Sequence, residues 1–350
     1  MKQITVDARM INASGIGTVI KNILKRLIQE KNDWHFNIIG KLKELNQFEF
    51  TRCANVTLIE CNAPIYSIKE QIALMRIIPK ETDVFWAPHY NIPLLYFGKL
   101  VVTVHDVFHL AMPQFVGGIH KRAYAKFMFE MVKRKADHII TVSEFTASEL
   151  EKYVGIPKER ISVIYNGIDE EWFNIRQGKK VHNKPYILYV GNVKPHKNLI
   201  TLVKAFLQVK DQVDYDLIIV GKKDGFITGD EEICKLVIQE PQRIIFTGYV
   251  EDDLLKQYYK QASIFVFPSL YEGFGLPPLE ALAAGCPRVL CSNAASLPEI
   301  CGNMVEYFEA KDTISLKNLL LRNNMAAKQE KIFLWRKTVE KYIKIIEKLK

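Results

Sequence analysis

The chain has 350 residues, 48% hydrophobic and 25% charged, a composition typical of globular proteins and not of disordered, fibrous or membrane-spanning ones. This length predicts two domains, because a domain usually takes about 100 to 200 residues. Lys and Arg outnumber Asp and Glu by 48 to 39, giving a net charge of +9 that favours anionic partners. Six cysteines without a CxxC pair predict neither a zinc site nor a disulfide scaffold. Asp7 and Arg9 would interrupt the apolar core of a signal peptide, so we expect none. A reducing, cytoplasmic location fits best.

The amino-terminal segment predicts a strand, a glycine loop and a helix. Residues Ile4–Asp7 alternate as a strand does, and Thr18–Gln29 has apolar residues at helical spacing. Between them, Gly15 and Gly17 predict a loop whose backbone approaches a phosphate or an acceptor. Ile20 stands where the GxGxxG fingerprint needs its third glycine, so a nicotinamide dehydrogenase is disfavoured.

His105 and Asp106 directly follow the β-rich run Leu100–Val104. They therefore lie at the carboxyl end of a buried strand, where open α/β sheets bind ligands. We expect His105 to hydrogen-bond to a substrate hydroxyl, and Asp106 to orient it or act on the acceptor. A satisfied core histidine and a turn-capping aspartate are the structural alternatives, and for Asp106 the two interpretations are balanced.

Residues 117–137 predict a helix with one apolar and one basic face. Six lysines and arginines stand here against two acids. The basic face is either simply solvated, or residues 120–135 touch an anionic membrane surface, where each basic residue contributes about 1 kcal/mol. No recognised nucleic-acid-binding module accompanies the charge, so we predict no nucleic-acid partner.

Residues 169–185 are polar and basic without an apolar period and predict a linker. The order strand, loop and helix then returns over 186–190, 191–197 and 198–209. Other short β-rich runs read as buried parallel strands separated by helices; they are Val84–Trp86, Leu100–Val104, His138–Val142, Leu217–Val220, Ile244–Phe246 and Ile264–Phe267. The predicted fold class is α/β with two doubly wound domains.

Lys197 stands at the predicted start of the helix that follows the second opening strand. A cation is disfavoured there because a helix carries positive partial charge at its amino end. A bound diphosphate would remove this penalty, which favours phosphate binding over a solvated surface lysine. Lys194 is the weaker candidate for the same role.

Asp214 and Asp216 form a DxD pattern, which metal-dependent sugar transferases use. They precede the strand predicted over 217–220 and so lie at its amino end, away from the expected ligand site. We predict a surface loop here and no metal site, because no other carboxylates cluster nearby.

The segment 271–275, Tyr-Glu-Gly-Phe-Gly, follows a strong strand and precedes a helix predicted from about Pro278. Its glycines permit close backbone approach, and the helix would aim free N–H groups at an anion. Glu272 in the loop and Glu280 in the first helical turn are predicted to face one cleft, where carboxylates suit the paired hydroxyls of a sugar or ribose. Alternatively, Glu272 caps the helix and Glu280 sits near its dipole.

These motifs together resemble the family 4 retaining glycosyltransferases, which have the GT-B architecture of two Rossmann-like domains around a cleft. The similarity covers nearly the whole chain, through SGIGTVIKNILKRL, TVHDVFHLAMPQF, ADHIITVSEFTASEL, VIYNGID, YVGNVKPHKNL, FTGYVEDDLLKQYYKQAS and FVFPSLYEGFGLPPLEALAAGCPRV. The Glu-x7-Glu pattern is specific when it follows the lysine loop at this distance. PIYSIKEQ and the HD and GNVKPHKN variants look most like bacterial mannosyltransferases of surface polysaccharide assembly.

The resemblance implies a hexosyltransferase that moves mannose from a nucleoside diphosphate sugar to a glycan or lipid-linked glycan. GDP-mannose is expected ahead of UDP-sugars, with no metal or other cofactor. The alternatives are a UDP-sugar-dependent transferase or a nucleotide-sugar epimerase on the same fold, and then a non-catalytic binding protein. The expected location is cytoplasmic and peripheral, on the inner face of the membrane.

The resemblance also implies roles for single residues. Lys197 would hold the diphosphate, Glu272 the transferred sugar and Glu280 the ribose, with His105 lining the sugar pocket. Where many members have an arginine this chain has Asn192, so Lys197 would carry more of the diphosphate charge. The predicted catalytic residues are Lys197, Glu272, His105 and Asp106, and the predicted donor-binding residues are Gly15, Gly17, Asn192, Lys197, Glu272, Gly273, Phe274, Gly275, Leu276 and Glu280.

The expected domains are residues 1–170 on the acceptor side and residues 184–330 on the nucleotide-sugar side. The last stretch, 331–350, has apolar positions at helical spacing. The resemblance implies that this helix crosses back onto the amino-terminal domain.

Overall fold

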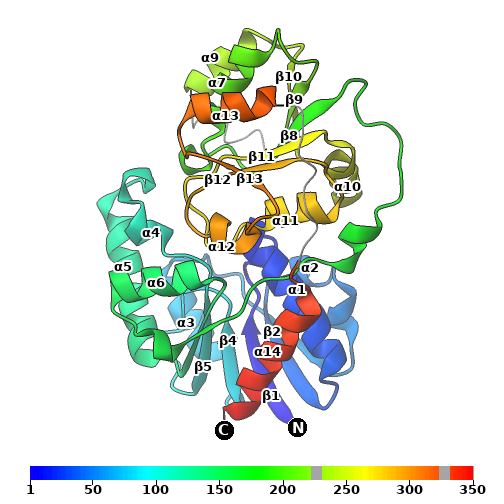
Figure 1. Ribbon diagram of the computed structural model, residues 1–350. Helices are drawn as coiled ribbons and strands as arrows, with labels where there is room; N and C mark the ends of the chain where they lie inside the picture. Colours follow the sequence, from blue (N-terminus) through cyan, green and yellow to red (C-terminus); the bar gives the residue numbers. More distant parts are fainter. Residues whose placement is uncertain (222–230, 323–331, 350) are drawn as a thin grey trace. The chain divides into compact units, whose positions relative to one another are not determined.

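The computed structural model describes residues 1–221, 231–322 and 332–349. The chain divides into two compact units (Figure 1): Met1–Gly167 together with Phe333–Lys350, and Ile168–Ile332. Each unit is built around one parallel sheet with helices packed on it.

The first unit holds a seven-stranded sheet in the order β3-β2-β1-β4-β5-β6-β7. Every strand pair is parallel, and the central strands are nearly continuous apolar runs, as expected of strands covered on both faces. The strands are β1 (Lys2–Asp7), β2 (Trp34–Gly40), β3 (Val56–Glu60), β4 (Val84–Ala87), β5 (Lys99–Val104), β6 (His138–Thr141) and β7 (Ile161–Val163). The strand order reverses between β1 and β4, which are neighbours in the sheet.

Helices cover both faces of this sheet. Apolar side chains of α3 (Ile68–Ile77), α5 (Ile119–Lys135) and α6 (Glu144–Val154) share one core with Phe85 and Val102. Trp86 and Thr103 alternate with these strand residues and so face the other side. The remaining helices of the unit are α1 (Ser14–Glu30), α2 (Leu42–Leu45), α4 (Phe108–Ala111) and α14 (Trp335–Lys348).

Helix α14, the last of the described helices, packs on this first unit beside α1 (Figure 1). Trp86 Nε1 donates to Thr103 Oγ1 at 3.0 Å, and Thr103 Oγ1 lies 2.9 Å from the Tyr342 hydroxyl. Trp335 and Tyr342 are almost fully buried. The stretch 331–350 therefore forms a helix from residue 335 to 348 whose apolar face is covered within the first unit; residues 331 and 350 lie outside the described part.

The second unit holds a six-stranded parallel sheet in the order β10-β9-β8-β11-β12-β13. Its strands are β8 (Tyr186–Val190), β9 (Asp216–Val220), β10 (Ile244–Gly248), β11 (Ile264–Phe267), β12 (Val289–Ser292) and β13 (Glu306–Phe308). Its helices are α7 (Leu199–Val209), α9 (Glu231–Ile238), α10 (Asp252–Gln261), α11 (Leu276–Ala283), α12 (Leu297–Cys301) and α13 (Thr313–Leu321). The strand order reverses between β8 and β11.

Two predictions about local structure are wrong. Gly15 and Gly17 do not form a loop, because α1 already begins at Ser14. A Cβ at position 17 would lie 2.3 Å from the carbonyl oxygen of Ile11, whereas one at position 15 would meet nothing within 4 Å. Gly17 is therefore required by close packing inside the first helical turn and not by a flexible loop.

Asp216 does not lie in a surface loop. It is the first residue of β9 and is buried. Its carboxylate accepts from Arg243 Nε at 2.8 Å and lies 2.7 Å from His182 Nε2. These partners satisfy a buried carboxylate, which would otherwise be costly.

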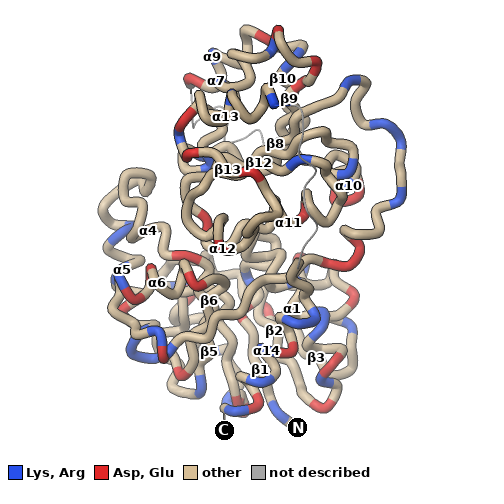
Figure 2. The backbone as a smooth tube through the Cα atoms, viewed as in Figure 1, with Lys and Arg blue, Asp and Glu red and all other residues tan. Residues whose placement is uncertain are grey.

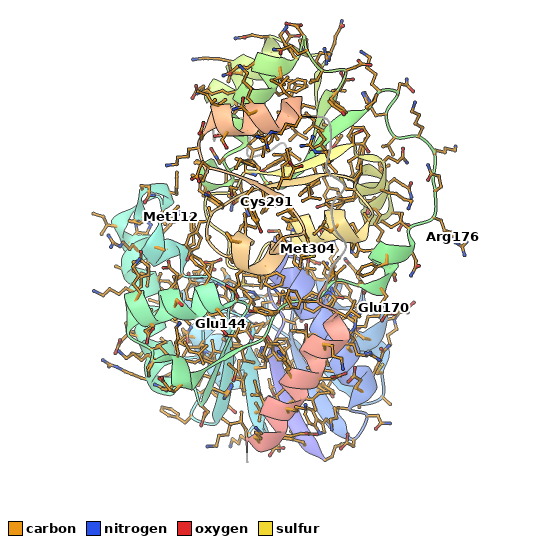
Figure 3. All side chains as sticks on the ribbon, viewed as in Figure 1. Met112, Glu144, Glu170, Arg176, Cys291 and Met304 are labelled. Carbon is orange, nitrogen blue, oxygen red and sulfur yellow. The ribbon has the colours of Figure 1, made fainter. Side chains whose placement is uncertain are left out.

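None of the six cysteines, all of which lie in the described part of the chain, forms a disulfide bond. Cys291, labelled in Figure 3, lies on β12 and is fully buried within the second unit. A buried thiol of this kind packs as a small apolar group.

Candidate functional site

The strand reversal in the second unit places two loops side by side. Residues 191–198 follow β8, and residues 268–275 follow β11, its neighbour in the sheet. Ligands of open α/β sheets bind outside the carboxyl ends of the strands at such a reversal. Both loops were singled out from sequence, and the sheet order explains why they meet.

Hydrogen bonds fasten the two loops to each other. Leu270 N–H donates to the His196 carbonyl at 2.8 Å, and Asn198 Nδ2 donates to the Pro268 carbonyl at 3.0 Å. Asn198 has φ 54°, a left-handed conformation that asparagine tolerates better than most residues. Asn198 follows the single 3₁₀ turn Pro195–Lys197 and directly precedes α7. Lys197 is thus held on a fixed backbone.

Lys197 and Glu272 form an ion pair at the centre of this site. The Lys197 Nζ to Glu272 Oε1 distance is 2.6 Å, and the side chains are only 23% and 15% exposed. The same ammonium lies 5.8 Å from the centroid of the Phe267 ring, within reach of a cation–π interaction. Two residues predicted to hold different parts of one ligand therefore lie within hydrogen-bond distance of each other.

Hydrogen bonds from Ser296, in the connection between β12 and α12, hold the loop that carries Glu272. Ser296 Oγ donates to the carbonyls of Glu272 at 3.0 Å and Phe274 at 2.7 Å. Gly275 has φ 108°, and a Cβ there would lie 2.7 Å from Leu297 Cδ2. A glycine is needed at position 275 both for its backbone conformation and for space.

Helix α11 begins at Leu276, earlier than the predicted start near Pro278. Because Pro277 and Pro278 have no N–H, this helix end has fewer amide donors than an ordinary one. Glu280 consequently falls in the second turn, not the first.

Glu280 is partnered away from the ion pair. Its Oε2 accepts from the Tyr259 hydroxyl of α10 at 3.0 Å. Burial of the carboxyl group raises the pKa of Glu280 to about 7. Among the contacts of the described residues, Glu280 touches neither Lys197 nor Glu272 through a hydrogen bond or ion pair. The structure thus brings Lys197 and Glu272 together and places Glu280 in α11, bonded to Tyr259 of α10.

The other predicted residues of this loop pair differ in exposure. The Asn192 carbonyl accepts from the Tyr189 hydroxyl at 3.2 Å, whereas Lys194 is exposed. Burial and the charges of Lys197 and Lys194 lower the pKa of His196 to about 3. Phe274 is buried and Leu276 half-buried. Lys197 is therefore the lysine of this loop that is placed at the strand reversal.

In the first unit, His105 and Asp106 follow β5. His105 Nε2 lies 2.9 Å from the Pro88 carbonyl, which can only accept, so Nε2 carries the proton. Burial lowers the pKa of His105, which keeps the ring neutral. Asp106 Oδ1 accepts from the Phe108 N–H at 2.9 Å, the contact of a turn cap.

Sequence reasoning missed a buried charged network at the strand reversal of the first unit. Arg9 Nη2 lies 2.6 Å from Asp7 Oδ2, and Arg9 Nη1 lies 2.9 Å from Glu70 Oε2. Asn91 Nδ2 donates to Glu70 Oε1 at 2.6 Å. Asp7 ends β1, and this strand-end position was the signal that could have identified it. A small cavity of about 10 Å³ lies here, lined by Asp7, Arg9, Met10, Ile65, Ala87, Pro88, His89 and Asn91.

His89 and Tyr66 extend this network. His89 Nδ1 accepts from the Asn91 N–H at 3.2 Å, and His89 Nε2 lies 3.3 Å from the Tyr66 hydroxyl. Burial, together with nearby His105, His109 and Arg9, lowers the pKa of His89 to about 3, so its ring is neutral. Tyr66 has φ 65°, a left-handed conformation that is rare for a large side chain. Such strained residues cluster at functional sites.

Among the described residues, no group of three or more His, Cys, Asp or Glu side chains is arranged to hold a metal ion. None of the described helices combines the length and the apolar character needed to cross a membrane.

Comparison with protein families assigns both halves of the chain. The profile described as "Glycosyltransferase Family 4" matches residues 13–172, and the profile described as "Glycosyl transferases group 1" matches residues 170–323. The chain belongs to the family 4 glycosyltransferases.

Curated relatives include bacterial mannosyltransferases. The chain is 30% identical to O-antigen chain mannosyltransferase B of Escherichia coli, over 63% of this chain and 59% of that protein. It is also 30% identical to O-antigen chain mannosyltransferase RfbU of Salmonella typhimurium, over 66% of this chain and 62% of that protein. The matched region thus spans about six tenths of the length of these relatives.

Solved structures share the fold. Sucrose-phosphate synthase from Thermosynechococcus elongatus superposes with a TM-score of 0.76 at 20% identity, covering 100% of this chain and 99% of that one. The Anabaena protein HepE, in complex with UDP and glucose, gives a TM-score of 0.77 at 16% identity over 100% of both chains. The two Rossmann-like α/β units are therefore those of GT-B glycosyltransferases.

Proposed function

We propose that the chain is a retaining hexosyltransferase that moves mannose from a nucleoside diphosphate sugar to a glycan or lipid-linked glycan. The observation that carries the proposal is the Lys197–Glu272 ion pair, set at the strand reversal of the second unit. Breaking the bond between an anomeric carbon and a diphosphate leaves negative charge on the diphosphate and positive character on the sugar ring. A lysine beside a carboxylate complements both charges.

In the proposed mechanism Lys197 stabilises the departing diphosphate. Amide N–H groups at the start of α11, from Gly275 and Leu276, assist it. These contacts accelerate transfer only because they strengthen as charge develops in the transition state. Glu272 neutralises Lys197 in the ion pair, so donor binding exchanges this partner for the diphosphate.

Glu272 then faces the hydroxyls of the transferred sugar, and Glu280 accepts from the ribose. Both roles use carboxylate oxygens as hydrogen-bond acceptors. His105 and Asp106 are assigned to the sugar pocket and the acceptor. Asn192, Gly273 and Phe274 contribute to the walls of the donor site.

We assign no protein nucleophile. Retaining glycosidases use two carboxyl groups to form and resolve a covalent intermediate, whereas Glu272 is already engaged by Lys197 and Glu280 by Tyr259. The acceptor hydroxyl instead attacks the face from which the diphosphate leaves. Its proton passes to the departing phosphate oxygen as the new glycosidic bond forms.

The proposed donor is GDP-mannose, with UDP-sugars as the alternative and no metal required. The names of the mannosyltransferase relatives support mannose. The same proposal places the chain in the cytoplasm on the inner face of the membrane, with residues 120–135 touching anionic lipids. A nucleotide-sugar epimerase is less favoured, because it would convert its substrate without any acceptor.

A thermal-shift screen of nucleotide sugars tests the proposal. A ligand at 100 times its dissociation constant stabilises a protein by about 2.7 kcal/mol, so GDP-mannose should raise the melting temperature most. Lys197→Ala should abolish the shift and Lys194→Ala should preserve it. No shift with either GDP- or UDP-sugars would overturn the proposed donor class, and conversion of the sugar without acceptor would favour the epimerase.

A further inference from the structure

The side chain of Tyr259, on α10, links Glu280 to the polar segment at the start of the second unit. Its hydroxyl donates to Glu280 Oε2 at 3.0 Å, and the residue is fully buried. Burial and the neighbouring Glu280 raise the pKa of Tyr259 well above its ordinary value. The hydroxyl therefore keeps its proton and always acts as the donor in this pair.

Two aromatic rings hold the Tyr259 ring in place. The Trp172 ring meets it edge-on, with 5.2 Å between the ring centroids and 83° between the ring planes. The Phe265 ring of β11 has its centroid 5.3 Å from that of Tyr259. Aromatic pairs at about 4.5 to 7 Å stabilise a structure beyond the area that they bury. The Tyr259 hydroxyl thus approaches Glu280 from a ring that is fixed by its neighbours.

Trp172 belongs to a segment that is packed along α10, residues 169–181, which we call the strap. Glu170 and Arg176 within the strap are labelled in Figure 3. Figure 2 shows that the strap begins with acidic residues and continues with basic ones. The sequence predicted a linker here, and the structure assigns this part of it to the second unit.

Side chains of α10 fasten the strap. Lys256 Nζ lies 2.9 Å from Glu171 Oε2. Gln257 and Gln261, one helical turn apart, each donate to a strap carbonyl and accept from a strap N–H at 2.9 to 3.1 Å. Their backbone partners are Arg176, Gly178, Lys179 and Val181. Trp172 is therefore held beside Tyr259 by a segment that is anchored on both sides of it.

We infer that Tyr259 and Trp172 are positioning residues that set Glu280 for the ribose of the donor. The Tyr259 hydrogen bond holds Oε2, and in the described part of the chain no group donates a hydrogen bond to Oε1. A carboxylate that is held by one oxygen loses less conformational freedom when the other oxygen accepts from a ligand hydroxyl. The inference rests on the ribose contact in the proposed function and adds the two residues that prepare Glu280 for it.

The inference predicts that the Tyr259 hydroxyl and the ribose hydroxyls are energetically coupled. Isothermal titration would compare guanosine and uridine diphosphate with their 2′,3′-dideoxy analogues at about pH 8, where Glu280, with its pKa of about 7, is mostly ionised. The parent should bind the ribose forms about 10- to 100-fold more tightly, as expected of a hydrogen bond to a charged group. Tyr259→Phe should reduce this preference about fivefold, through the added cost of ordering Glu280, and leave the affinity for the dideoxy forms unchanged.

Substitutions near Tyr259 separate positioning from general damage to the fold. Tyr258→Phe removes a hydroxyl from the preceding residue of α10, whose ring lies near Tyr186 instead, and should leave the preference unchanged. Trp172→Ala should lower the preference as Tyr259→Phe does, whereas Trp172→Phe should restore most of it. An equal loss of affinity for ribose and dideoxy forms in Tyr259→Phe and Trp172→Ala would indicate a structural role only and would overturn the inference.

Failure of this inference is distinguishable from failure of the proposed function. If the parent bound neither guanosine nor uridine diphosphate, the transferase proposal would fail and the inference with it. If the parent bound ribose and dideoxy forms equally, the ribose contact of Glu280 and its positioning would both be wrong. If the parent preferred the ribose forms and both Tyr259→Phe and Trp172→Ala kept this preference, only the positioning roles would be overturned.

Discussion

At the level of single residues, the proposed donor site depends on one short distance, 2.6 Å between Lys197 Nζ and Glu272 Oε1. The ion pair is partly buried, so removing either partner leaves a charge poorly solvated. Each residue thereby holds the other in position.

Lys197→Ala should lower turnover by about 10²- to 10³-fold while the fold is retained, the cost of removing one group that stabilises developing negative charge. Steady-state release of nucleoside diphosphate in the presence of acceptor measures this. Glu272→Ala should also lower turnover strongly. The exposed Lys194→Ala is the control; near-normal rates in both site variants would refute these roles.

Glu280 should make stability depend on pH. Its folded pKa of about 7 lies above the ordinary value of 4.5, so the folded state holds the proton more tightly. Its stabilising contribution is complete below pH 4.5 and is lost as the pH rises through 7. Glu280→Gln should therefore match the parent's melting temperature at low pH and exceed it above pH 7. A difference that stays constant across this range would contradict the raised pKa.

At the scale of elements, the sequence was most informative where apolar runs end in glycine or polar residues. Continuous apolar strands predicted the parallel sheets and the loops that follow β8 and β11, whose role in donor binding stays a prediction. The start of α11 was missed, because Pro277 and Pro278 obscured it. The Arg9–Glu70 pair was missed for a different reason: its residues are 61 positions apart, and only the sheet order brings them together.

Substitutions at Gly15 and Gly17 test whether these residues form the first turn of α1 or a flexible loop. Gly15→Ala should stabilise the chain by about 0.5–1 kcal/mol, because alanine favours a helix and nothing lies within 4 Å of the added Cβ. Gly17→Ala should destabilise it, because the Ile11 carbonyl blocks the Cβ. Urea denaturation measures both. Equal effects of the two substitutions would support a flexible loop instead.

At the scale of the whole molecule, each unit uses the same construction. A parallel sheet reverses its strand order, and polar side chains gather at that reversal: Lys197 and Glu272 in one unit, and Asp7, Arg9 and His89 in the other. The family assignment joins the two halves in one enzyme class.

The packing of α14 on the first unit can be tested at Tyr342. Tyr342→Phe removes the hydroxyl that meets Thr103 at 2.9 Å, and a buried hydrogen bond of this kind contributes about 1 kcal/mol. We expect a lower melting temperature with unchanged donor affinity, measured by calorimetry. A loss of donor affinity without a loss of stability would show that this helix serves the site directly.

A double-mutant cycle on donor affinity tests whether Lys197 and Glu272 hold the donor. Isothermal titration would compare the parent with Lys197→Ala, Glu272→Gln and the double variant, using both the free nucleoside diphosphate and the intact nucleotide sugar. Lys197→Ala should weaken both ligands at least about tenfold, whereas Glu272→Gln should weaken only the nucleotide sugar. If both single variants bound both ligands as the parent does, the ion pair would not be the donor site.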